Sequence, residues 1–159
     1  MSVCRRINNI LAVILLFMGV GCSSESLKRS DTPQTRIQAQ RSVGVSLPES
    51  ASEIYCLSYV GGLQDLEQFV RFDVPKADLE EAVESLIAEN NKMMGRELIY
   101  PKSAISKVRH PELREQFLPM PWWTPASISN GYYRGHIDGY ALRLFVDEEN
   151  SRLYVYQGD

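Results

Sequence analysis

Apolar residues are unevenly distributed along this 159-residue chain, and that distribution limits where a core can form. A dense apolar run from Ile10 to Val20 is followed by residues 23–52, which are mostly Ser, Thr, Gln, Arg, Pro and Glu without a helical or strand period. Composition typical of globular proteins begins only near Glu53. We therefore expect one folded domain over residues 53–159, long enough to bury roughly two-thirds of its unfolded surface.

The N-terminal residues have the pattern of a secretory signal. Arg5 and Arg6 supply the positive charge that precedes the apolar run, and small glycines follow it. As a helix, the run from Ile10 to Val20 covers roughly 17 Å, whereas the hydrocarbon core of a bilayer is about 30 Å thick. The run is too short to span a membrane, so we expect residues 1–21 to be a cleaved signal peptide.

The sequence Met18-Gly19-Val20-Gly21-Cys22 resembles the lipobox of bacterial lipoproteins. The resemblance covers only the first 22 residues, and it departs from the family at Gly19, where an aliphatic residue such as Leu is usual. It implies that the Cys22 thiol receives a diacylglycerol and that a signal peptidase then cuts before this residue. Two acyl chains are enough for stable anchoring in a membrane. The alternative is an ordinary secreted protein with an incidental cysteine.

The residues after the lipobox bear on the location and reach of the domain. Ser23 and Ser24 follow Cys22 with no Asp beside it, which in Gram-negative lipoproteins resembles the default route to the periplasmic face of the outer membrane. Residues 22–52 read as a disordered, flexible tether with a root-mean-square reach of about 30 Å. With such a tether the domain can stand clear of the membrane surface, so we expect no requirement for contact with lipid.

Charge excludes two classes of partner. Removal of residues 1–21 takes away Arg5 and Arg6 and no acidic residue, so the 17 basic residues fall to 15 against 20 acidic ones, a formal charge of −5. Nucleic acids and anionic lipid headgroups both require a basic surface. The expected contacts are therefore the membrane through the lipid anchor, and an envelope protein or cell-wall component.

Apolar periodicity predicts one principal helix. Pro75 is placed to begin a helix over residues 76–90, and the apolar residues recur at the spacing of one buried stripe. The stripe consists of Leu79, Ala82, Val83, Leu86 and Ile87. The acidic residues that lie off the stripe favour a solvated outer face over an acidic binding face.

Strand patterns lie on both sides of this helix. Residues 54–60 and 67–74 flank a Gly61-Gly62 turn, and residues 131–137, 140–146 and 152–156 form a second group, of which the last two make a hairpin. The middle region 92–118 is irregular, with a short helix over 111–117. The predicted fold class is α+β, with a mainly antiparallel sheet packed on the one helix.

The Pro-rich segment around Trp122 and Trp123 is the candidate binding surface. Together with Tyr132 and Tyr133, an exposed indole would form an aromatic platform for a sugar, a peptide or a protein. The alternative is that the segment plugs the core or covers the edge of the sheet.

A histidine–aspartate pair and a cysteine are the other candidates for catalysis or metal binding. His136 and Asp138 share one side of a strand, an arrangement that suits an oriented base, but no Cys or His cluster supplies the remaining ligands of a zinc site. Cys56 lies in a strand pattern and is interpreted as a small buried hydrophobe. We therefore expect no catalytic residue, no metal and no cofactor.

The sequence as a whole is similar to small bacterial envelope lipoproteins that combine a lipobox, a polar tether and a compact domain. A noncatalytic binding or interaction module is the first hypothesis. The alternatives are an envelope hydrolase with a site around His136 and Asp138, and a structural component of the envelope.

Overall fold

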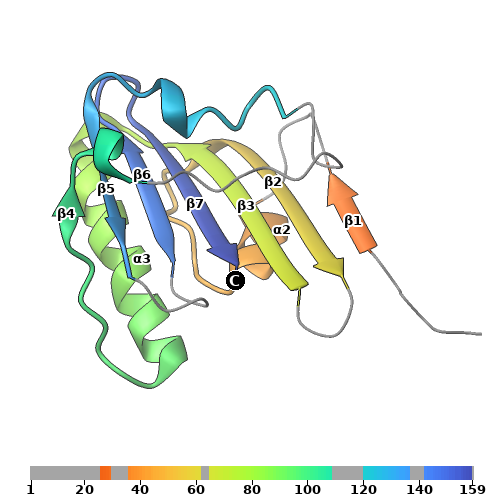
Figure 1. The fold of residues 1–159 in the computed structure, drawn as a ribbon. Coiled ribbons are helices and arrows are strands. Elements are labelled where there is room, and N and C mark those ends of the chain that lie inside the picture. Colours follow the sequence, from red (N-terminus) through yellow and green to blue (C-terminus); the bar gives the residue numbers. More distant parts are fainter. Residues whose placement is uncertain (1–25, 30–35, 62–64, 109–119, 137–141, 159) are drawn as a thin grey trace, which may run out of the picture.

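The computed structural model describes residues 26–29, 36–61, 65–108, 120–136 and 142–158 (Figure 1). Seven strands form one sheet in the order β1-β2-β3-β7-β6-β5-β4, and every neighbouring pair is antiparallel. The strands are β1 (Ser26–Arg29), β2 (Ser52–Gly61), β3 (Asp65–Asp73), β4 (Lys102–Ser103), β5 (Gly131–Gly135), β6 (Arg143–Asp147) and β7 (Arg152–Gly158). The predicted α+β class and the antiparallel sheet are confirmed.

The principal helix is confirmed and extends further than predicted. A short 3₁₀ turn, η1 (Lys76–Asp78), follows Pro75 and leads into α3 (Leu79–Met94). All five residues of the predicted apolar stripe are buried. The helix ends at Gly95, whose φ of 65° is the left-handed conformation that glycine adopts without a steric penalty. Its amide N–H donates to the Asn91 and Lys92 carbonyls, which satisfies the last turn.

The sheet has an apolar layer on each face, because successive side chains in a strand point to opposite sides. On β7, Leu153 and Val155 join the layer under α3, which we call the helix-side core. Tyr154 and Tyr156 join the other layer, which we call the aromatic face. Val70 and Phe72 on β3 lie together in the helix-side core.

The tether predicted for residues 22–52 is wrong for residues 36–51, because these residues help to build the core. The helix α2 (Arg36–Val43) packs on the same side of the sheet as α3 (Figure 1), with Ala39 and Val43 fully buried. Val45 and Leu47 are also buried in the helix-side core. Before α2, β1 adds an edge strand to β2. Short helices depend on tertiary packing for stability, so their own sequence shows little pattern.

The three strands predicted in the second half of the chain are confirmed, although their first or last residues differ from the prediction. β6 and β7 form the predicted hairpin, with Val146 opposite Leu153. Residues 137–141, where β5 was expected to end and β6 to begin, lie outside the described residues, as does the short helix predicted for 111–117. The described part of the middle region contains β4 and one 3₁₀ turn, η2 (Ile105–Lys107). A further 3₁₀ turn, η4 (Pro125–Ser127), follows the tryptophans.

The two ends of the sheet differ in what they carry. At the hairpin end, β3 and β6 end and β7 begins, and at the terminal end β1 begins and β7 ends (Figure 1). The helix α3 runs from the first to the second: Glu80 accepts a hydrogen bond from Tyr132 at the start of β5, and Asn90 accepts one from the amide of Leu142, just before β6. The start of α3 therefore belongs to the hairpin end.

Candidate functional site at the hairpin end of the sheet

The structure buries the tryptophans of the Pro-rich segment. Trp122 is 5% exposed and Trp123 is 6% exposed, and both pack on the aromatic face. The Trp123 ring makes edge-to-face contacts with Phe69 and Tyr154 at centroid separations of 5.0 and 5.5 Å. Aromatic rings prefer this geometry, which adds to the stabilisation from burial. Trp123 is therefore part of the core, as in the plug interpretation of the segment.

Trp122 packs against a different aromatic ring. Its ring stacks on Tyr55 of β2 at 5.8 Å with an interplanar angle of 22°, and the Arg71 guanidinium lies 4.9 Å from the centre of the same Tyr55 ring. The Trp122 indole N–H is buried and has no hydrogen-bond partner among the residues that the structure describes. An unpaired buried donor reduces stability, so this indole stabilises the domain less than its area suggests.

The four residues of the predicted platform do not lie together. Tyr133 joins the tryptophans on the aromatic face, whereas Tyr132, next to it in β5, points to the helix side. The Tyr132 hydroxyl donates to Glu80 at 2.5 Å, and Lys102 Nζ lies 3.5 Å from the centre of its ring. Burial, and then the hydrogen bond to Glu80, raise the pKa of Tyr132. Neither tyrosine lies beside an exposed indole, so the predicted aromatic platform does not form a binding surface.

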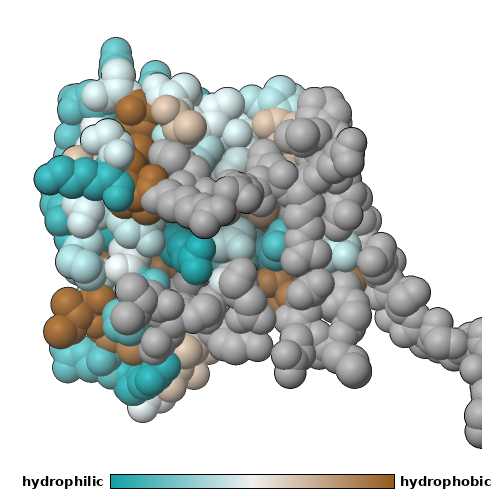
Figure 2. Space-filling view, in the orientation of Figure 1, coloured by the Kyte–Doolittle hydropathy of each residue, from teal (hydrophilic) through white to brown (hydrophobic). Residues whose placement is uncertain are grey.

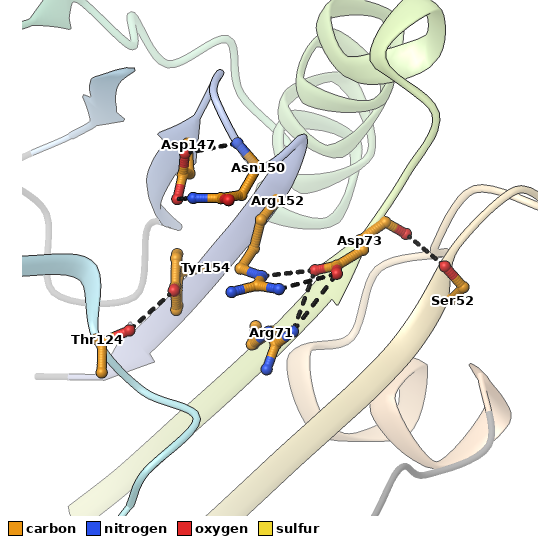
Figure 3. Close-up of polar contacts among 8 residues, drawn as sticks. All are labelled: Ser52, Arg71, Asp73, Thr124, Asp147, Asn150, Arg152 and Tyr154. Carbon is orange, nitrogen blue, oxygen red and sulfur yellow. Dashed lines mark hydrogen bonds and ion pairs between the residues drawn. The ribbon is translucent and has the colours of Figure 1, made fainter. Parts of the chain in front are cut away.

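A charged ladder crosses the hairpin end of the sheet (Figure 3). Asp73, Arg152 and Asp147 lie opposite one another on β3, β7 and β6. Arg152 donates to both carboxylate oxygens of Asp73, at 2.7 and 3.0 Å, and Arg71 approaches the same carboxylate at 3.4 Å. The bond to Asp73 is the main reason that the pKa of Arg152 is raised. This ladder fixes the end of β3 against β7.

The loops beyond the ladder are held by further bonds. Asp147 accepts from the backbone and the side-chain amide of Asn150 at 3.0 and 2.8 Å, which shapes the turn between β6 and β7 (Figure 3). The hydroxyls of Thr124 and Tyr154 lie 3.1 Å apart, which ties the Pro-rich segment to β7. The Glu148 amide donates to the Asn130 carbonyl at 3.0 Å. These contacts hold several loops in fixed positions around one end of the sheet.

Two open depressions lie between these loops and the start of α3. The first lies between the 48–50 loop and the helix, and its charged residues are Glu49, Asp78 and Glu81. The second lies beside the β6–β7 turn, and its charged residues are Lys76, Glu80 and Glu148. We call the five acidic residues of the two depressions the acidic rim. They are Glu49, Asp78, Glu80, Glu81 and Glu148.

The sequence pointed to the components of the rim but not to the rim itself. The acids on α3 were interpreted as a solvated helix face, and Glu80 and Glu81 are indeed exposed. Their neighbours Glu49 and Glu148 come from distant parts of the chain, which only the register of the sheet brings to the same end. The sequence signal is that the 48–50 loop, the start of α3 and the β6–β7 turn each contain at least one acidic residue.

The remaining candidate residues lie apart from the rim. His136 is half-buried, with its ring 6.3 Å from that of Tyr100, and Asp138 lies outside the described residues. Cys56 is half-buried against the helix-side core, and burial raises the pKa of its thiol. Across the described ranges, no group of three or more His, Cys, Asp or Glu side chains is arranged to hold a metal ion.

Comparison of the chain with protein-family models, with curated proteins and with solved structures found no match. Within the part of the chain that the structure describes, none of the helices is long and apolar enough to cross a membrane. The functional proposal below therefore rests on the residues of this chain alone.

Proposed function

We propose that this protein is a lipid-anchored bacterial envelope protein whose domain is a noncatalytic interaction module. In this proposal Cys22 carries the lipid, and the acidic rim binds a Lys- or Arg-rich segment of an envelope partner. The observation that carries the proposal is the rim: five carboxylates border two open depressions, and among the described residues that line them only Lys76 is basic.

The bonds of the hairpin end support this role. The ladder at Asp73 and the turn at Asp147 hold the bordering loops before any partner arrives. A surface that is already ordered loses little conformational entropy on binding, which favours affinity. Carboxylates of one sign also steer a cationic segment towards the site and raise its association rate. A membrane anchor would add a high effective concentration of any partner in the same envelope.

The anchor is tested by intact mass. The protein extracted from bacterial membranes should lack residues 1–21 and carry the added mass of acyl chains, and the Cys22→Ala variant should carry no acyl chain. A full-length or unacylated mature form of the natural sequence in the soluble fraction would contradict the anchor.

The rim is tested by crosslinking in the envelope. We expect the double variant Asp78→Lys and Glu81→Lys to lose a salt-sensitive crosslinked partner that the natural protein captures. The control is Glu97→Lys, which reverses an exposed charge just beyond the other end of α3. Loss of the partner in both variants, or in neither, would contradict the assignment of the rim, and circular dichroism checks that each variant is folded.

A further inference from the structure

We propose that the terminal end of the domain rests on the surface of the membrane that holds Cys22, so that the acidic rim faces away from the lipid. The inference rests on the lipid anchor proposed above and adds the orientation of the domain. It replaces the free tether with a direct contact between protein and bilayer.

The first argument is the length of chain between the lipid and the sheet. Ser26, the first residue of β1, pairs with Val60 at the end of β2, so β1 begins at the terminal end. Only three residues lie between Cys22 and Ser26, so their Cα atoms are four steps apart and at most about 14 Å from one another. The predicted thirty-residue tether reaches about 30 Å on average and far more when extended. A lipid on Cys22 therefore keeps this end of the sheet within one short step of the headgroups.

The second argument is the position of the exposed apolar side chains. Among the described residues, four large hydrophobic side chains are exposed, and three of them lie at the terminal end. Val60 at the end of β2 is 45% exposed, Met93 in the last turn of α3 is 47% exposed, and Ile99 is 77% exposed. The backbone of Leu98 bonds to the Asn91 side chain, which places the adjacent Ile99 beside the end of α3.

The apolar side chains lie towards opposite edges of the sheet. Val60 lies next to the edge strand β1, whereas Met93 is on α3, which lies towards β5, and Ile99 is in the loop that follows this helix. In Figure 2 hydrophobic atoms are exposed at the lower left, over the loop that leads from α3 to β4 in the orientation of Figure 1. Two separated apolar contacts define a plane better than one, so they favour a single orientation on a bilayer. The fourth exposed side chain, Ile37, lies on α2.

The third argument is the distribution of charge. Lys92 and Arg96 are exposed at the end of α3, beside the exposed Glu97, so the exposed charges at the end of this helix are mainly basic. The acidic rim is at the opposite end, and the nine residues of β3 between them span about 30 Å. That distance exceeds the Debye length of about 8 Å at physiological salt several times. The charge of the acidic rim therefore does not oppose contact between the terminal end and lipid.

The test measures which end of the full-length lipidated protein meets the bilayer. A polarity-sensitive fluorophore is attached at Val60→Cys or, as the matched control, at Glu149→Cys in the β6–β7 turn, each in a Cys56→Ala background. The protein is placed in phosphatidylcholine and phosphatidylglycerol vesicles that contain a nitroxide-labelled lipid. We expect a blue shift and a loss of emission at position 60 and neither at position 149. Equal emission at the two positions, with acylation confirmed by mass, would overturn the orientation.

The mass of the same sample separates this inference from the proposed function. A protein without acyl chains would overturn the anchor and the orientation together, whereas an acylated protein with an unquenched fluorophore at position 60 overturns only the orientation. A long Gly/Ser insertion between Ser24 and Glu25 completes the test. It should reduce the quenching at position 60 while acylation persists, and unchanged quenching would contradict the role of the short connection.

Discussion

Arg152 on β7 holds Asp73 on β3 through two hydrogen bonds, from Nε at 2.7 Å and from a terminal guanidinium nitrogen at 3.0 Å. About three-quarters of each side chain is buried, and Arg71 approaches the same carboxylate from two residues earlier on β3. A two-point contact between a guanidinium and a carboxylate fixes direction as well as distance. The pair therefore aligns β3 with β7 at the end of the sheet that carries the acidic rim.

Replacing Asp73 with Asn should lower the free energy of unfolding by about 1–2 kcal/mol, because two arginines lose the charge that they share. Urea denaturation measures the change. The control is Glu84→Gln, which removes the partner of Arg134 at 2.7 Å. The Glu84 side chain is 54% exposed, so water screens that pair and its loss should cost less than about 0.5 kcal/mol. Equal costs at the two sites would contradict the structural role of Asp73.

Trp123→Ala should destabilise the domain by about 3–5 kcal/mol, because it removes a buried ring that contacts Phe69 and Tyr154. Trp122→Phe should cost about 1 kcal/mol or less, since it also removes the indole N–H that has no partner. Denaturant midpoints of the two variants test this order. A stable, fully folded Trp123→Ala protein would contradict its place in the core and return the indole to the list of binding residues.

The sequence predicted those helices and strands whose buried residues follow a long, regular apolar pattern. The stripe from Leu79 to Ile87 and the alternation in β3, β6 and β7 gave the helix, the hairpin and the fold class. Both faces of β7 are buried. The run that contains Tyr154 and Tyr156 therefore predicts a strand, but it does not reveal the aromatic layer that these two residues join. Alternation shows which residues share a face, but it does not show what covers that face.

Elements with few buried residues escaped the sequence pattern. The helix α2 buries only Ala39 and Val43, and its other residues are polar except for the exposed Ile37, so the sequence predicted a tether there. The acidic rim escaped for a different reason. Its members Glu49, Asp78 and Glu148 lie on three separate segments, and only the pairing of the strands brings them to one end. Sites assembled by sheet register are not visible in a linear sequence.

A chain that begins at Ser52 should be less stable than one that begins at Ser26 by at least about 3 kcal/mol, because it lacks buried apolar residues of the helix-side core. These residues are Ala39, Val43, Val45 and Leu47. Urea unfolding of the two chains measures the difference, and the shorter chain should also bind more of a dye that reports exposed apolar surface. Equal midpoints would restore the tether interpretation of residues 36–51.

The stability of the domain should decline at alkaline pH in part through Cys56. Burial against the helix-side core raises the pKa of its thiol above the ordinary value of 9.0, although a hydrogen bond with Ser42 acts in the opposite direction. Above the ordinary value the unfolded chain releases this proton while the folded chain keeps it, so the unfolded state binds fewer protons and the free energy of unfolding falls. The contribution of the thiol is complete below the ordinary value and is lost as the pH rises through the raised pKa.

Cys56→Ala should therefore flatten the decline in the range just above the ordinary thiol pKa. Urea unfolding of both proteins at a series of pH values measures the two slopes. Burial also raises the pKa of Tyr133, and that of Tyr132, so a further decline at higher pH should persist in the variant. Parallel curves for the two proteins through the thiol range would show that Cys56 titrates alike in the folded and unfolded states, which its half-buried position in β2 argues against.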